Sequence, residues 1–164
     1  MSRYAIYMAT LGNRPDLFPG SEYVGKYTEP PEGYEVPREY LDDETFAAIL
    51  SEAEKYIGYP YVWGGSSPAT SFDCSGYVSW VINHSGWNVG RLGAQGLYNI
   101  CTPTSNPQPG DLVFFKGTYD TPGVSHCGIY VGDNKMLHCG DPIGYANLNT
   151  SYWQSHFYAY GRLP

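Results

Sequence analysis

Three residues, Cys74, His126 and His138, have side chains that could act together as a nucleophile, a general base and a group that orients the base. Cys74 lies in the stretch SFDCSGYVSW, where apolar residues at spacings of three and four predict a helix that starts near the cysteine. A helix N-terminus favours a thiolate and can bind an oxyanion. Gly76 has no side chain, so another segment of the chain can approach the first turn of the helix closely. This stretch alone is equally consistent with a cysteine packed as a small core residue.

The two histidines belong to two predicted strands, residues 125–132 and 135–140, which the segment GDNK joins into a hairpin. Side chains alternate between the two faces of a strand, so the register of the hairpin decides whether His126 and His138 share a face. Only a shared face allows the two rings to act together.

The turn between these strands can set two registers. A tight two-residue turn at Asp133 and Asn134 would put Ile129 opposite His138, and the histidines would then point to opposite faces. A three-residue loop or a bulge would put Gly128 opposite His138, and the histidines would become diagonal neighbours on one face. We expect this second register, because Asn134 tolerates the left-handed backbone that such loops need.

Zinc binding and disulfides are the alternatives for the cysteines and histidines. Cys74, His126 and His138 could bind zinc, but the chain lacks the local pairs, such as C-x-x-C, on which zinc sites usually draw. The four cysteines could form two disulfides, but a chain of 164 residues does not need them for stability. We therefore predict no metal, and we expect Cys127 and Cys139 to be core residues on the face opposite the histidines.

The other elements form a scaffold for these residues. The segment 42–57 predicts a helix that Asp42 or Asp43 caps and that Gly58 and Pro60 end. Its apolar stripe consists of Phe46, Ile49, Leu50, Ala53 and Ile57. A second, short helix is predicted at 94–100, and further strands at 110–117 and 155–163. Helices followed by antiparallel strands predict an α+β fold.

The chain divides into two parts. Residues 1–40 are rich in proline, glycine and tyrosine, which predicts an extended arm or linker, with a short helix within 3–12. Residues 41–164 form the predicted domain, of a length that suits a single core. We also consider that the chain is part of a longer, multidomain protein.

Composition excludes several classes of partner. The net charge of −7 argues against nucleic acid and anionic membranes, and no apolar run reaches the length of a membrane span. The first residues do not form a signal peptide, so we expect either a cytoplasmic protein or a piece of a secreted one. The 17 tyrosines are amphipathic and fit either a surface that handles sugars or peptides, or the rim of the core.

Four blocks in order, YVWGG, FDCSGYV, PGDLVFF and SHCGIYVGDNKMLHCG, resemble the signature of the NlpC family of papain-like cysteine peptidases over about residues 42–164. The resemblance implies a papain-like fold in which N-terminal helices pack on an antiparallel sheet of about five strands. It implies Cys74 as the nucleophile, His126 as the general base and His138 as the residue that orients it, with no cofactor. It also implies a monomer that acts in the cell wall or outside the cell on peptidoglycan stem peptides.

The resemblance further implies substrate contacts around the nucleophile. Tyr61 would lie beside Cys74, Asp73 and Ser75 would help to hold the substrate, and Arg91 would meet a substrate carboxylate. The bond cut would be the one between γ-linked D-glutamate and the following diamino acid. The alternatives are an amidase or acyltransferase on the same scaffold and an inactive wall-binding module.

Overall fold

The computed structural model describes residues 34–164 as one α+β unit. The helices are the 3-10 helix η2 (Arg38–Asp42), α3 (Glu44–Glu54), α4 (Cys74–Asn83), α5 (Ala94–Ile100) and α6 (Ser151–His156). The strands are β1 (Ser66–Ser67), β2 (Ser71–Phe72), β3 (Thr102–Thr104), β4 (Leu112–Lys116), β5 (Val124–Gly132), β6 (Lys135–His138), β7 (Gly144–Asn147) and β8 (Phe157–Arg162).

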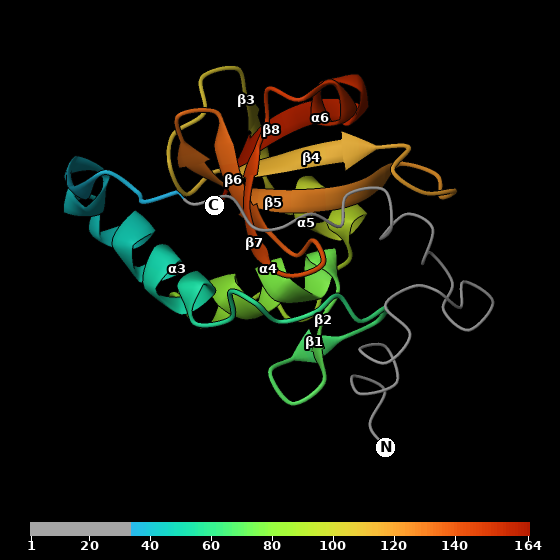
Figure 1. The fold of residues 1–164 in the computed structure, drawn as a ribbon, viewed down its shortest axis with the longest axis horizontal. Helices are drawn as coiled ribbons and strands as arrows, with labels where there is room; N and C mark the ends of the chain where they lie inside the picture. Colours follow the sequence, from blue (N-terminus) through green and yellow to red (C-terminus); the bar gives the residue numbers. More distant parts are fainter. Residues whose placement is uncertain (1–33) are drawn as a thin grey trace.

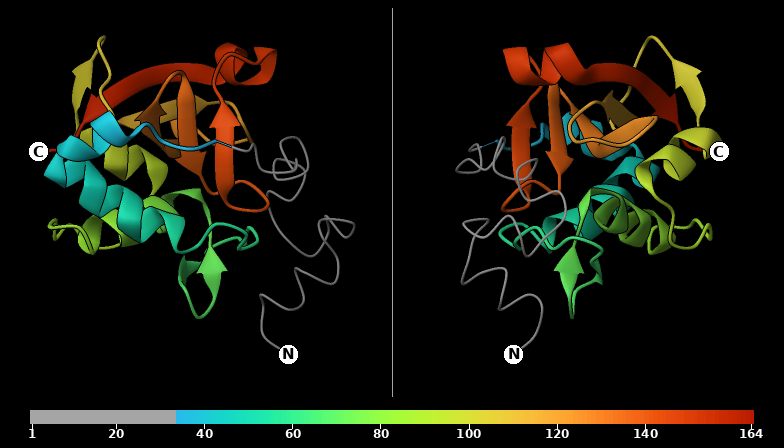
Figure 2. Two further views of the ribbon diagram at one scale, coloured as in Figure 1. Left: turned by 60° about the vertical axis from the view of Figure 1, so that its left-hand side comes forward. Right: turned by 90° about the vertical axis from the view of Figure 1, so that its right-hand side faces the viewer.

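An antiparallel sheet of six strands, in the order β3-β8-β4-β5-β6-β7, is the centre of the fold. Helices α3, α4 and α5 lie on one side of this sheet, and the short α6 lies on the other side (Figures 1 and 2). The predicted α+β architecture with helices on an antiparallel sheet is therefore confirmed. The sheet has one strand more than the five or so that we expected.

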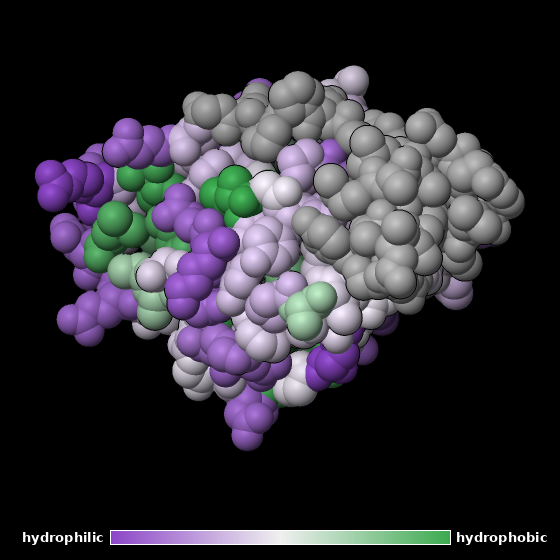
Figure 3. Space-filling model, turned by 60° about the horizontal axis from the view of Figure 1, so that its bottom comes forward, coloured by the Kyte–Doolittle hydropathy of each residue, from purple (hydrophilic) through white to green (hydrophobic). Residues whose placement is uncertain are grey.

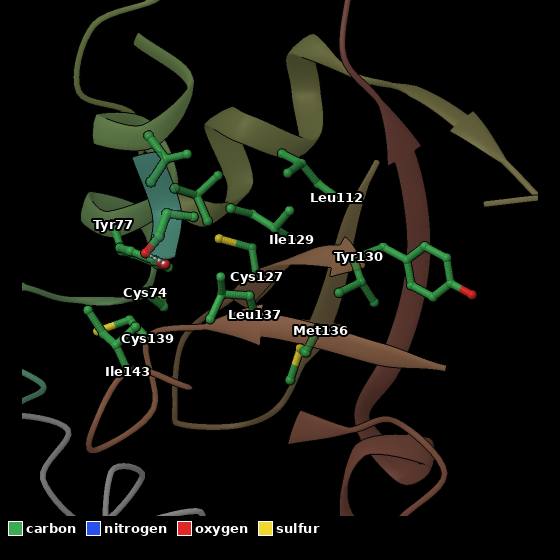
Figure 4. Packing of buried hydrophobic residues seen from close by; sticks show 14 of the residues in the cluster. Cys74, Tyr77, Leu112, Cys127, Ile129, Tyr130, Met136, Leu137, Cys139 and Ile143 are labelled. Atoms are coloured by element: carbon green, nitrogen blue, oxygen red, sulfur yellow. Dashed lines mark hydrogen bonds between the residues drawn. The ribbon is translucent and has the colours of Figure 1, made fainter. Parts of the chain in front are cut away.

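The core lies between the sheet and the three larger helices. Side chains alternate along β5, so Cys127 and Ile129 point from the sheet toward α4, as does Leu137 from β6, whereas Tyr130 and Met136 point away from it (Figure 4). Cys127 and Cys139 are both completely buried, so the prediction that they are core residues is confirmed. All four cysteines are free thiols.

Helix α3 begins as predicted but ends earlier. The side chain of Asp43 accepts hydrogen bonds from the backbone N–H groups of Thr45 and Phe46, so Asp43 is the cap. The helix ends at Glu54, and Ile57 is 38% exposed. Our inclusion of Ile57 in the buried stripe was therefore wrong, because the chain leaves the helix before that residue can face the core.

The hairpin of β5 and β6 combines features of both predicted geometries. Asp133 and Asn134 form a two-residue turn with positive φ angles of 54° and 56°. A bulge between Tyr130 and Gly132 adds a residue to β5, and the register beyond it pairs Ile129 with Leu137. Continuation of that register puts Gly128 opposite His138. The predicted register is thus confirmed, and the bulge produces it.

The remaining differences concern short elements. The edge strands β3 and β7, the small β1–β2 pair and α6 were not predicted, because each is too short to show a clear periodicity. The helix expected within 3–12, and most of the expected arm, lie outside the described residues. Tyr34 and Tyr40, at the end of that arm, donate hydrogen bonds of 3.0 and 2.9 Å to the Asp133 carboxylate and so contact the domain.

The surface and the helices give two further observations on the described part of the chain. Among residues 34–164, no helix has the length and apolar character needed to cross a membrane. On the side that carries α3 and β1, hydrophilic and hydrophobic residues are intermixed, and the hydrophobic areas are small and separate (Figure 3).

Candidate active site

The nucleophile candidate, Cys74, is the first residue of α4, as predicted. Asp73 caps this helix, and its carboxylate accepts a hydrogen bond of 2.7 Å from the backbone N–H of Gly76. The loop before the helix packs directly on this first turn, because a Cβ atom at Gly76 would lie 2.0 Å from the carbonyl oxygen of Gly65. Gly76 therefore gives the slim first turn that we expected.

The Cys74 thiol lies between α4 and β5 and is almost completely buried. The residue is 5% exposed, and its Sγ donates a hydrogen bond of 3.8 Å to the backbone carbonyl of Ser125, the residue just before His126. A hydrogen bond with Cys74, together with burial, raises the pKa of the Cys127 thiol well above its usual value. Cys74 thus contacts the two residues that flank His126 in β5, the backbone carbonyl of Ser125 and the thiol of Cys127.

The structure brings His126 and His138 together. Their nearest ring nitrogens, Nε2 of His126 and Nδ1 of His138, are 2.9 Å apart, and the two rings are nearly perpendicular at 87°. Gly128 makes room for this contact, because a Cβ atom there would lie 3.0 Å from the Cβ atom of His138. The sequence signal for this pair was correct, and it depended on the hairpin register.

Both histidines are held as neutral rings. Burial lowers the pKa of His126 well below its usual value, and the neighbouring His138 lowers it further. Burial lowers the pKa of His138 to about 3. Both rings are therefore uncharged at neutral pH in the resting site.

Trp153 of α6 covers the histidine pair and was missed by the sequence analysis. Its ring stacks on His126 with centroids 5.3 Å apart at 22°, and it meets His138 nearly at right angles at 5.2 Å. It also contacts Phe115 of β4 at 4.7 Å and is 5% exposed. Nothing in the sequence distinguishes it from a core aromatic, because its position depends on how α6 folds back over the sheet.

Three of the predicted substrate-binding residues form one polar cluster at the start of α4. The guanidinium of Arg91 donates two hydrogen bonds, of 2.9 and 3.0 Å, to the two carboxylate oxygens of Asp73. A third hydrogen bond of 2.8 Å joins Arg91 to the hydroxyl of Ser75. The structure therefore pairs Asp73 and Arg91 with each other, whereas the sequence analysis treated them as separate contacts for a ligand.

Aromatic residues from two loops surround the same region. Tyr61 is 1% exposed and pairs with Phe72, two residues before Cys74. Trp63 packs edge-on against Tyr119 of the β4–β5 loop, with ring centroids 5.1 Å apart. Burial raises the pKa of Tyr119, and the charges of Cys74 and Asp73 raise it further.

The part of the chain that the structure describes contains no set of side chains arranged to bind a metal ion. No group of three or more histidine, cysteine, aspartate or glutamate side chains in residues 34–164 is placed to hold an ion. The zinc alternative has no arranged site there, and the cysteine and histidines stand as candidates for acid–base and nucleophilic chemistry.

Comparisons with known proteins identify the family to which the chain belongs. Residues 58–162 match the model of the NlpC/P60 family. The chain is 41% identical over 121 residues to the bifunctional muramidase/DL-endopeptidase CwlT of Bacillus subtilis, covering 72% of this chain and 36% of that protein. It is 40% identical over 112 residues to the γ-DL-glutamyl hydrolase of the same organism, covering 65% of this chain and 27% of that protein.

A solved structure gives the same result for the fold. A protein from Staphylococcus aureus, described as similar to a lipoprotein of the NLP/P60 family, superposes with a TM-score of 0.71 at 40% identity. The match covers 87% of this chain and 48% of that one, and the chain spans only about a third of the length of CwlT. Since the family match extends over more than half of the sequence, the chain belongs to the NlpC/P60 family.

Proposed function

We propose that this domain is a cysteine endopeptidase that hydrolyses peptidoglycan stem peptides through an acyl-enzyme on Cys74. The observation that carries the proposal is the 2.9 Å contact between His126 and His138, together with a thiol at a helix N-terminus that contacts the residues flanking His126 in the chain. A buried imidazole held by a neutral acceptor, beside a cysteine, is the arrangement that thiol-based acyl transfer needs. The names of the two Bacillus relatives support the same class of reaction.

The proposed mechanism assigns one role to each of the three residues. His138 accepts a hydrogen bond at Nδ1 from the Nε2–H of His126, so the lone pair of His126 lies on Nδ1 and takes the proton of the Cys74 thiol. The thiolate attacks the amide carbonyl, and backbone N–H groups at the start of α4 stabilise the oxyanion. His126 then protonates the leaving amine, and water hydrolyses the thioester.

The substrate side is assigned to the polar cluster. We place the free α-carboxylate of a γ-linked D-glutamate at Arg91 and a substrate ammonium at Asp73, with Tyr61 and Ser75 beside them. A substrate that carries both charges can exchange partners with the Asp73–Arg91 ion pair without leaving a charge unpaired. This supports cleavage between the glutamate and the diamino acid. We place this activity at the cell wall, as part of a longer secreted protein.

Two other functions use the same fold. An amidase or acyltransferase would use the same thiol on a different acyl group or acceptor, and a wall-binding module would leave the thiol idle. The buried, neutral histidine pair favours a catalytic domain over an inactive wall-binding module. A module that only binds the wall has no use for two adjacent buried imidazoles with lowered pKa values.

Cleavage of the synthetic peptide L-Ala-γ-D-Glu-diamino acid, followed by mass spectrometry, tests the proposal. The wild-type protein should release the diamino acid, and Cys74→Ala should abolish release while its circular dichroism spectrum stays unchanged. Cys127→Ala is the matched control, because it removes a neighbouring buried thiol and should retain most of the activity. Release of whole stem peptides from the sugar would favour an amidase, and equal activity of wild type and Cys74→Ala would exclude the mechanism.

A further inference from the structure

An aromatic groove lies at the edge of the sheet, away from the polar cluster. Strand β3 pairs only with Tyr160–Arg162, so the first half of β8 extends beyond the end of β3. The groove beside this open edge has a volume of about 480 Å³. It is lined mainly by Pro103, Thr104, Ser105, Phe157, Tyr158 and Tyr160.

The lining exposes large apolar side chains to solvent. Phe157 is 42% exposed and Tyr158 is 41% exposed, and they are two of the four large apolar side chains exposed among residues 34–164. They are neighbours in one groove, whereas the other two, Leu41 and Ile57, lie elsewhere. Clustered exposed rings beside hydroxyl groups are typical of a ligand surface.

The groove begins two strands away from His126 in the sheet, and His126 itself is buried beneath Trp153. Phe157 of β8 lies opposite Phe115 of β4, and Phe115 lies opposite His126 of β5. Neighbouring strands are about 4.8 Å apart, so Phe157 is about 10 Å across the sheet from His126. A sugar that carries a stem is separated from the proposed scissile bond by two amino acids, or about 7 Å of extended chain plus the linking group.

The polar cluster around Asp73 and Arg91 explains why a glycan-linked substrate would need a second contact with the protein. A stem that is still attached to sugar has no free N-terminal amine, so it offers no N-terminal ammonium to Asp73, which already has Arg91 as its partner. Such a substrate must be held by other parts of the molecule. The pyranose ring of an amino sugar has an apolar C–H face that packs on an aromatic ring, and its hydroxyl and N-acetyl groups bond to side chains such as those of Thr104 and Ser105.

We propose that the groove formed by Phe157, Tyr158 and Tyr160 binds an N-acetylated amino sugar of the glycan strand that bears the stem peptide. This inference rests on the proposed function for its choice of ligand. It assigns the groove a role in selecting substrates that are still linked to glycan.

Binding is tested first, without any need for activity. The Cys74→Ala protein is titrated with a soluble N-acetylglucosamine tetramer, and NMR shift changes should locate at the groove. Phe157→Ala or Tyr158→Ala should weaken this binding about three- to tenfold each, because one aromatic contact is lost. Ile57→Ala is the matched control, with a similarly exposed apolar side chain outside the groove, and should bind as wild type.

Activity is then compared on two substrates. The groove variants should cleave glycan-linked wall fragments several-fold more slowly and the free tripeptide at the wild-type rate. Equal losses on both substrates would make the groove a peptide site and overturn the proposal, as would shifts confined to residues near Cys74 or no binding at all. The wild-type protein could also bind the tetramer at the groove and cleave neither substrate. That result would support the sugar site and refute the proposed endopeptidase activity.

Discussion

The two halves of the candidate site are built in different ways. The helix half, around Asp73 and Arg91, is charged and partly exposed, with side-chain exposures of 14% and 39%. The sheet half, around His126 and His138, is uncharged, and both histidines are buried at 0% and 4% exposure. Hydrogen bonds between charged groups hold the first half, whereas packing, strand register and a hydrogen bond between two neutral rings hold the second.

This difference indicates where the site is tolerant and where it is not. An ion pair at the surface contributes little to stability and can exchange partners with a ligand. A buried ring whose place depends on a bulge and on an aromatic cover has no alternative position, because a one-residue slip moves it to the other face. We therefore expect changes in the sheet half to have larger effects than changes in the helix half.

The largest effect is expected from His138→Ala. Loss of the acceptor frees the His126 ring to rotate, so turnover of the tripeptide should fall roughly a hundredfold, with little change in KM. Met136→Leu is the control, since it changes a buried side chain on the same strand face without touching the ring contact. A rise in KM with unchanged turnover would instead make His138 a substrate contact.

Acid should destabilise the fold through the same two histidines. Their pKa values are lowered in the folded chain from the usual 6.5, to about 3 for His138, so below pH 6.5 only the unfolded chain binds these protons. Their contribution is fully present above pH 6.5 and is lost as the pH falls toward the folded pKa values. The free energy of unfolding should decrease by about 1.4 kcal/mol per pH unit for each histidine.

Urea unfolding at pH 7, 6 and 5 measures this slope. His138→Gln removes one of the two groups, so its slope should be smaller than that of the wild type by about 1.4 kcal/mol per pH unit. Identical slopes in the two proteins would show that His138 is accessible to protons in the folded state.

Trp153→Leu should have a smaller effect on catalysis, about tenfold on turnover, because His126 keeps its partner but loses the ring stacked on it. The acid limb of the pH–rate profile should also shift, since the cover contributes to the burial that lowers the pKa of His126. Phe114→Leu is the matched control, a buried aromatic on the opposite face of the sheet. An equal loss of turnover in both variants would indicate a general effect of core packing.

The sequence predicted the residues whose chemistry is local. The helix that starts at Cys74 and the narrow first turn at Gly76 follow from spacing within a few residues, whereas the cap at Asp73 was not predicted. Strands β4, β5, β6 and β8 and the shared face of the histidines also followed, once a bulge or a longer loop was considered. Ile57 was misplaced because helix ends are decided by competition among several weak signals.

Contacts between distant segments could not be predicted. The cover by Trp153 requires α6 to return over the sheet, and the Trp63–Tyr119 contact joins two loops that are far apart in the chain. The pairing of Arg91 with Asp73 is also tertiary, since a loop residue with a long side chain has many partners available. Neither periodicity nor capping rules contain this information.

The smallest effect is expected from Arg91→Lys in the helix half. Lysine keeps the charge but has a single nitrogen, whereas Arg91 bonds to Asp73 through one nitrogen and to Ser75 through another, so the site for a substrate carboxylate loses its geometry. KM for the tripeptide should rise by about three- to tenfold with turnover nearly unchanged, and stability should change by at most about 1 kcal/mol. Steady-state kinetics and urea unfolding measure the two quantities.

Arg162→Lys provides the matched comparison for that prediction. Arg162 also contacts both oxygens of a carboxylate, that of Asp111, at 3.2 and 2.9 Å, but this pair does not involve the residues around Cys74. The variant should lose a similar, small amount of stability and keep the wild-type KM. If both variants raise KM equally, Arg91 acts only by supporting the fold, and if Arg91→Lys lowers turnover instead, the Asp73–Arg91 pair positions the start of α4 and with it the thiol.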